Sequence, residues 1–246
     1  ADELIAEISP GKVTLGESHT FDYYIRSAFT ARNDGFDRIE IATPFTSTVS
    51  EVELDGVPID FSFENTDKNR LRIQLTQNRI SESGQLLRIR LNGLVTVYGT
   101  TFFAKVFDSQ KDELGQDVVA GDASPEGESD RLSVQGRLRN QLVLDLSVNT
   151  PTFSPNGDGI NDNLNISYVL LRALQEVSVD LSLYDLSGRL VRRLQNAGAT
   201  NGPQELLWNG LNDSNNAVAP GLYMLHLSVE TDTGIEEQTR LIGVAY

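Results

Sequence analysis

The chain has 246 residues, 39% of them hydrophobic and 22% charged, so it is long enough for two globular domains and too apolar for a disordered chain. Its net charge of -15 disfavours binding to nucleic acid or to anionic membranes. Cysteine is absent, which excludes disulfides, thiolate metal sites and a cysteine nucleophile. No apolar run approaches the roughly 18 residues that a membrane-spanning helix needs, and we expect no membrane insertion.

Alternating apolar and polar residues predict β-strands along most of the chain. The clearest alternation occupies residues 71–75, 87–91, 177–183 and 223–229. Turn-forming segments fall between such runs at roughly the 8–12-residue spacing of antiparallel sandwiches. They are Asn33-Asp34-Gly35, Asp55-Gly56, Ser83-Gly84, Asn92-Gly93, Ser187-Gly188, Pro220-Gly221 and Thr233-Gly234. The sequence therefore predicts an all-β fold.

An acidic stretch interrupts the first half of the chain. Residues 108–130 include eight acidic residues and a single basic residue, Lys111. We interpret the stretch as a solvated loop, with recruitment of cations as the sharper alternative. Strands are expected after it, at 132–134 and 142–148, before a segment rich in proline and glycine that begins at residue 149. We therefore expect two tandem antiparallel β-sandwich modules, residues 1–149 and 150–246.

The segment SPNGDGIND at residues 154–162 has the composition of a calcium loop. Calcium prefers hard oxygen ligands at alternate positions of a tightly curled loop. Aligned with an EF-hand-type loop, Asn156, Asp158 and Asp162 supply side-chain oxygens and Ile160 supplies a backbone carbonyl. Gly159 permits the sharp turn. These four ligands predict a bound Ca2+.

The segment departs from the EF-hand template at two positions. Ser154 stands at position 1 and Asn165 at position 12, where calcium loops carry acids. The remaining ligands would come from the 108–130 stretch, from Asp213 or from water. The alternative is an Asx-rich turn whose side chains satisfy its own backbone.

An entry segment and three ordered motifs in the second half resemble known bacterial modules. Residues 153–164 resemble the "SPNGDGxND" entry segment of the C-terminal modules of gliding-motility and type IX-secreted surface proteins. Residues 179–194, 208–213 (WNGLND) and 218–223 (VAPGLY) are similar to segments of the Ig-like domain of the flagellar hook-capping protein. The resemblance covers residues 151–246 and implies an Ig-like fold there; no family is identified for residues 1–150.

Four residues of the second half are expected to have structural roles: Gly188, Trp208, Gly221 and Tyr223. Gly188 would take the positive φ of a tight hairpin turn. Trp208 is the one tryptophan, and we interpret it as a buried core anchor rather than a platform for ligand stacking. Pro220 marks the beginning of the strand that contains Gly221 and Tyr223, because proline cannot donate to a strand ladder.

No catalytic constellation is recognisable in the sequence, and we expect no enzyme. His19 and His226 are the two histidines, and each lies in a strand-like run. The chain has no nucleophile elbow, phosphate-binding glycine loop or zinc-binding His-Glu-x-x-His segment. The sequence leaves open a catalytic pair of carboxylates that the fold brings together, because such a pair is not visible in the sequence.

The sequence thus predicts a non-catalytic extracellular or cell-surface module of a bacterial structural or adhesive protein or filament, with calcium stiffening the junction between modules. Two alternatives stay open: the C-terminal sorting or anchoring region of a type IX-secreted protein, and a carbohydrate-binding accessory module. The adjacent aromatic residues Tyr23-Tyr24 and Phe102-Phe103 would point to opposite faces of a sheet, which disfavours a glycan platform.

The expected partners follow from these functions. They are other surface-protein subunits or copies of the same chain, with the secretion machinery or a surface glycan as alternatives. The apolar run at residues 240–246 is expected either to close its own sheet or to pair with the sheet edge of a neighbour.

Overall fold

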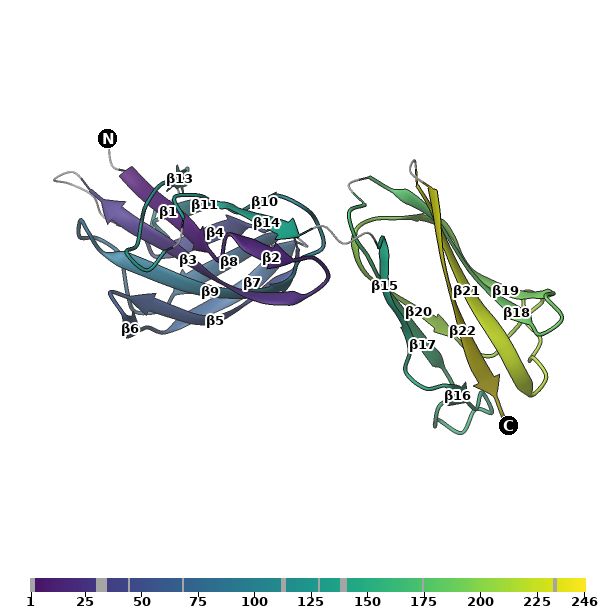
Figure 1. Ribbon diagram of the computed structural model, residues 1–246. Coiled ribbons are helices and arrows are strands. Elements are labelled where there is room, and N and C mark those ends of the chain that lie inside the picture. Colours follow the sequence, from purple (N-terminus) through teal and green to yellow (C-terminus); the bar gives the residue numbers. More distant parts are fainter. Residues whose placement is uncertain are drawn as a thin grey trace. The chain divides into compact units, whose positions relative to one another are not determined.

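The chain folds into two compact units, Ala1–Leu138 and Arg139–Tyr246, and every regular element described in them is a β-strand (Figure 1). The structure is a computed structural model that describes residues 3–29, 35–43, 45–67, 69–111, 114–127, 129–137, 141–173, 175–231 and 234–246. Within these ranges no helix has the length and hydrophobicity to cross a membrane. The predicted all-β architecture of two sandwiches is confirmed.

Unit 1 is built from three sheets. Its strands are β1 (Glu3–Ser9), β2 (Lys12–Thr14), β3 (Ser18–Ala28), β4 (Arg38–Ala42), β5 (Ser47–Leu54), β6 (Val57–Pro58), β7 (Phe61–Asp67), β8 (Arg70–Leu75), β9 (Leu86–Leu94), β10 (Thr100–Thr101), β11 (Phe103–Phe107), β12 (Gln116–Asp117), β13 (Val119–Ala120) and β14 (Ser133–Arg137). The strand orders are β13-β1-β3-β9-β5-β6, β12-β11-β4-β8-β7 and β10-β14-β2.

The core of unit 1 comes from the alternating strands that the sequence predicted. Along β8 and β9 every second side chain is buried, which places one face of each strand against the core. Three phenylalanines, Phe21, Phe45 and Phe102, pack together with ring centroids 5.6–6.2 Å apart. Burial of each large apolar side chain contributes roughly 1.5–3 kcal/mol relative to exposure.

Unit 2 is a two-sheet sandwich. Its strands are β15 (Val143–Val148), β16 (Thr152–Phe153), β17 (Leu164–Leu170), β18 (Val177–Asp185), β19 (Leu190–Ala199), β20 (Gly202–Trp208), β21 (Gly221–Thr231) and β22 (Gly234–Val244). One sheet has the order β15-β17-β20 and the other β16-β22-β21-β18-β19 (Figure 1). The short strand β16 runs parallel to β22, and all other pairs are antiparallel. This arrangement is Ig-like.

Aromatic side chains anchor the core of unit 2. Trp208 is 1% exposed and packs against Phe153 and Tyr223, with ring centroids 5.1 and 5.9 Å away. Its indole Nε1 donates to the carbonyl of Leu211 at 2.9 Å. The Tyr223 hydroxyl donates to the carbonyl of Ala219 at 2.6 Å, so the third residue of β21 forms a tyrosine corner, as in Ig-like sandwiches.

The boundary between the units lies between residues 138 and 139, and not at residue 149 as predicted. The physical reason is the pairing of β15, which bonds to β17 from Val143↔Leu170 to Val148↔Ile166. β15 is therefore the first strand of the second sandwich instead of the last strand of the first. The acidic stretch 108–130 lies in unit 1, as expected.

The turn predicted at Asn92-Gly93 is wrong. Both residues lie inside β9, where Gly93 pairs with His19 of β3 and with Ser47 of β5. A Cβ at Gly93 would lie 2.2 Å from the Phe45 ring, so the glycine serves close packing there instead of a turn. The predicted turns at Asp55-Gly56, Ser83-Gly84 and Ser187-Gly188 do connect strands. Residues 33, 34 and 233 of two further predicted turns lie outside the described residues.

The last strand, β22, lies inside its own sheet between β21 and β16. Side chains of β22 also reach the neighbouring edge strand β15. Glu236 accepts the backbone N–H groups of Leu142 (2.6 Å) and Val143 (3.2 Å), and Arg240 donates to the carbonyl of Leu146 (3.0 Å). The strand thus closes its own sheet, which is one of the two roles predicted for residues 240–246.

Candidate functional site

The predicted calcium loop connects β16 to β17 inside unit 2. β15 begins beside the end of β17 and ends beside its start, so this loop lies at the end of unit 2 opposite to where the chain enters it. The loop is therefore not part of the segment that joins the two units. Calcium bound in this loop would not lie at the junction between the units, where the sequence analysis expected it to act. Three loop residues have left-handed φ values: Gly157 (83°), Gly159 (87°) and Asn161 (56°).

The side-chain oxygens of this loop accept hydrogen bonds from its own backbone. Asp162 accepts the N–H groups of Gly157 (2.6 Å) and Gly159 (2.7 Å) on its two oxygens. Asp158 and Asn156 each accept the N–H group two residues further on, at 2.8 and 3.0 Å. The Asn156 amide also donates to the second oxygen of Asp158 at 3.1 Å. This geometry is that of the Asx-rich turn considered as the alternative.

The donor set of the loop does not by itself fit a resident calcium ion. Calcium takes about 6–8 oxygen ligands, whereas this loop offers about four, from the side chains of Asn156, Asp158 and Asp162 and the carbonyl of Ile160. Among the described residues no three His, Asp or Glu side chains gather in a metal-binding group. The carboxylate of Asp213 accepts the N–H of Arg193 at 3.2 Å. Calcium binding through Asn156, Asp158, the Ile160 carbonyl and Asp162 stays a prediction.

The turn between β18 and β19 is held by a carboxylate that the sequence did not single out. Asp185 accepts the Ser187 hydroxyl (2.6 Å), the Arg189 N–H (3.0 Å) and the Arg189 guanidinium (2.8 Å). The Ser187 bond and then the Arg189 N–H bond lower the pKa of Asp185 to about 2. Gly188 has a φ of 81° in this turn, as expected for its predicted role.

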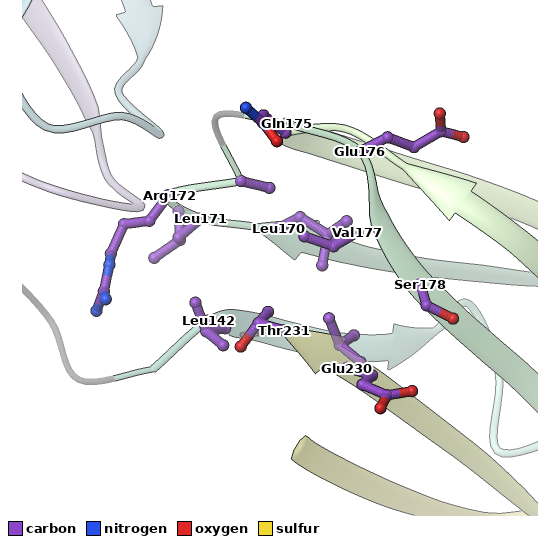
Figure 2. A pocket seen from close by; sticks show the side chains of 12 residues that line it. Leu142, Leu170, Leu171, Arg172, Gln175, Glu176, Val177, Ser178, Glu230 and Thr231 are labelled. Carbon is purple, nitrogen blue, oxygen red and sulfur yellow. The ribbon is translucent and has the colours of Figure 1, made fainter. Parts of the chain in front are cut away.

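A hollow of about 670 Å³ opens at the end of unit 2 where the chain enters it. Leu170, Leu171 and Val177 lie on one side, and Leu142 and Thr231 lie across from them (Figure 2). Charged and polar side chains, among them those of Arg172, Gln175, Glu176 and Glu230, also line it.

Unit 1 contains a buried carboxylate that sequence reasoning missed. Glu7 is 0% exposed, although alternation with Leu4, Ala6 and Ile8 places it on the outer face of β1. Part of the acidic stretch covers it, and its Oε1 accepts the N–H groups of Ala123 (3.0 Å) and Ser124 (2.5 Å). Among the described residues its Oε2 has no hydrogen-bond partner. The acidic stretch is thus partly packed on the sheet and not simply solvated.

The aromatic pairs considered for glycan binding are mostly buried. Tyr23, Tyr24 and Phe102 are 0%, 4% and 0% exposed, and Phe103 alone of the four reaches the surface. A row of exposed aromatic rings is therefore not formed by these residues.

Comparison with known proteins adds one family match. Residues 146–243 match the family model described as CHU_C Type IX secretion signal domain. The match lies within unit 2 and reaches from β15 to β22. A type IX secretion signal domain implies a protein that is secreted or displayed at the cell surface. No curated protein matches the chain.

Several solved structures show a weak likeness. Dimeric latent PorU from Porphyromonas gingivalis has a TM-score of 0.35 at 14% identity, with 99% of this chain and 20% of that chain covered. Domains D2 and D3 of the major pilin SpaD from Corynebacterium diphtheriae have a TM-score of 0.36 at 13% identity, with 96% of this chain and 88% of that chain covered. BcpA, the major pilin subunit of Bacillus cereus, has a TM-score of 0.35 at 8% identity, with 100% of this chain and 67% of that chain covered. The chain spans about a fifth of PorU, and these scores are too low to bear on function.

Proposed function

We propose that unit 2 is the sorting module by which the type IX secretion machinery recognises this protein, and that unit 1 is a structural or adhesive sandwich that it delivers to the cell surface. The observation that carries the proposal is the match of residues 146–243 to a type IX secretion signal domain. Of the functions that the sequence left open, sorting therefore ranks above the structural filament and the glycan-binding module.

The extent of unit 2 supports its role as a separate module. The match begins within β15 and ends within β22, the first and last strands of the sandwich. The core cluster of unit 2 draws its residues from this range and from residues adjoining it, including Val143, Trp208 and Val244. A module with its own core can keep its fold when attached to different cargo.

The outer faces of unit 1 support a structural role for it. Arg72 lies between Glu40 and Glu64, 2.9 Å from each, on one sheet. Arg90 lies between Asp22 (2.8 Å) and Glu51 (2.9 Å) on the six-stranded sheet. Ladders of paired charges keep sheet faces hydrated and protect them against aggregation, while each exposed pair contributes only about 0–1 kcal/mol to stability. The proposal assigns no reaction to the chain and requires no bound calcium.

The test is the location of the chain in a bacterium that has type IX secretion. The full chain, preceded by an inner-membrane export signal, is expressed in an intact strain and in a strain whose type IX machinery is inactivated. We expect full-length protein outside the intact strain and periplasmic protein in the inactivated strain. A chain that ends at residue 138 is expected to stay in the periplasm of both. Equal export from the two strains would refute the proposal.

A further inference from the structure

Part of the acidic stretch covers one edge of the six-stranded sheet of unit 1. We name residues 118–127 and 129–131 the strap. β1 bonds to β3 on one side, and on the other side its partner is the two-residue strand β13 of the strap (Figure 1). The strap adds two backbone bonds to this edge: the Gly121 N–H donates to the Ala6 carbonyl (3.0 Å), and the Ile8 N–H donates to the Arg131 carbonyl (2.9 Å). Without the strap, β1 would present a free edge seven residues long.

Two other edges of the large sheets of unit 1 are protected by their own sequences. At the far side of the six-stranded sheet, β6 has only two residues, and one of them is Pro58, which has no N–H to donate. At one side of the five-stranded sheet, β7 carries the charges of Glu64 and Asp67. Short strands, prolines and charges keep an edge from pairing with another chain. The β1 edge depends on the strap instead.

Two opposite charges hold one residue of the strap. Glu7 of β1 accepts the Ala123 N–H at 3.0 Å, and Arg26 of β3 donates through Nε to the Ala123 carbonyl at 2.5 Å. The Ser124 N–H adds a bond of 2.5 Å to the same Glu7 oxygen. We name Glu7 and Arg26 the clamp. Hydrogen bonds to charged groups are stronger than neutral ones, so the clamp fixes the strap on the outer face of the sheet.

Apolar packing adds little to this hold. The buried residues of the strap are Val118, Ala123 and Ser124, and of these Val118 alone has a sizeable apolar side chain. The clamp also has a cost, because among the described residues the second oxygen of the buried Glu7 has no hydrogen-bond partner. Opening of the strap would return that oxygen to water. The closed and open states therefore differ less in free energy than they would with an apolar cover.

We propose that the strap is an autoinhibitory cover: while the clamp holds it, the strap blocks β1, and its release lets two copies of the chain pair edge to edge through β1. A free strand edge binds another strand, because its N–H and C=O groups need backbone partners. Two copies related by a twofold axis present the same edge to each other, so their β1 strands can pair antiparallel and join the two six-stranded sheets. The inference concerns unit 1 and goes beyond the sorting function proposed for unit 2.

Three variants test the clamp. Glu7→Ala/Arg26→Ala removes both of its charges. The matched control is Glu64→Ala/Arg72→Ala, a pair of the same residue types that lie 2.9 Å apart on the five-stranded sheet. Ala123→Pro opens the strap in a second way, since it deletes the N–H that Glu7 accepts and leaves the sequence of the sheet intact.

A disulfide can pin the strap in its closed position. A Cβ at Gly121 would lie 3.3 Å from the Cβ of Ile5, close to the separation of roughly 3.5–4.5 Å that disulfides bridge. The chain has no cysteine, so Ile5→Cys/Gly121→Cys introduces one bond without competing thiols. Peptide mass analysis verifies that the bond forms within one chain. Added to the clamp variant, this bond should keep the strap closed until a reductant is supplied.

Hydrogen exchange reports which part of unit 1 has opened, and sedimentation velocity measures self-association. In the clamp variant we expect the amides of Gly121, Ala123 and Ser124 to exchange at least about tenfold faster than in the wild type, while the amides of β9 stay protected. The same variant should dimerise with a dissociation constant at least about tenfold below that of the wild type. Ala123→Pro should behave like the clamp variant, and the control pair should match the wild type. The oxidised disulfide should abolish the dimerisation of the clamp variant, and reduction should restore it.

Three outcomes would overturn the inference. If the strap amides of the clamp variant exchange as slowly as those of the wild type, the clamp does not hold the strap. If they exchange rapidly while β9 stays protected and the protein remains monomeric, β1 is not a pairing edge. If the oxidised and reduced forms dimerise equally, the contact lies elsewhere. Should the clamp variant lose the protection of β9, the same outcomes are read from Ala123→Pro.

Discussion

Truncation of Trp208 probes the packing on which unit 2 depends. The indole is 1% exposed, contacts the rings of Phe153 and Tyr223, and donates to the carbonyl of Leu211 at 2.9 Å. Trp208→Ala should lower the free energy of unfolding of unit 2 by roughly 3–5 kcal/mol, since it loses the buried surface and leaves a cavity. A domain of this kind has about 5–15 kcal/mol in total, so the variant lies near the limit of stability.

Trp208→Phe separates packing from the hydrogen bond. Phenylalanine retains much of the ring surface but leaves the Leu211 carbonyl without its donor, for which we expect a cost of about 1–3 kcal/mol. Leu207→Ala is the control at the neighbouring position, because Leu207 is 66% exposed and should change stability by about 0.5 kcal/mol or less.

Urea unfolding followed by circular dichroism measures all three variants. Because the chain has a single tryptophan, wild-type fluorescence identifies which transition belongs to unit 2. A loss below about 1 kcal/mol for Trp208→Ala, or wild-type emission typical of a hydrated indole, would refute the burial argument.

Three further predictions address other parts of the chain. Gly127→Ala should destabilise unit 1 by roughly 1–3 kcal/mol in urea unfolding, because a Cβ there would lie 1.9 Å from the Glu7 carboxylate; an unchanged midpoint would contradict this packing. The pKa of Asp185 is about 2 in the folded unit and near 3.9 when unfolded, so its stabilising contribution is present above about pH 4 and is lost as the pH falls towards 2. Asp185→Asn should remove that part of the pH dependence, and equal slopes for variant and wild type would argue against it. If Asn156, Asp158 and Asp162 bind calcium as the sequence predicts, millimolar calcium should raise the melting temperature of unit 2 above its value with a chelator, and Asp158→Ala should abolish the rise; equal melting temperatures would leave the loop as an Asx-rich turn.

The sequence predicted the strands well because period-two alternation is a local property. Residues 71–75, 87–91, 177–183 and 223–229 all lie in strands with one buried face. The unusual residue types were also informative: Trp208 and Tyr223 are buried, and Gly188 has the left-handed φ of its turn.

The predictions from sequence that were wrong all depend on contacts between residues far apart in the chain. The boundary was misplaced because proline and glycine near residue 149 indicate a turn but do not reveal that β15 pairs with β17. A turn was predicted at Gly93 because the packing of this glycine against Phe45 is not visible in the sequence. Glu7 alternates like a solvated residue, and only a loop more than 110 positions later buries it.

The central claim is that residues 139–246 are sufficient to direct a protein through type IX secretion. The most direct measurement attaches these residues to a reporter that otherwise remains in the periplasm and determines its location in strains with and without the machinery. The account predicts reporter outside the intact strain and periplasmic reporter in the inactivated one. A folded fusion that remains periplasmic in both strains, or that leaves both equally, would contradict it.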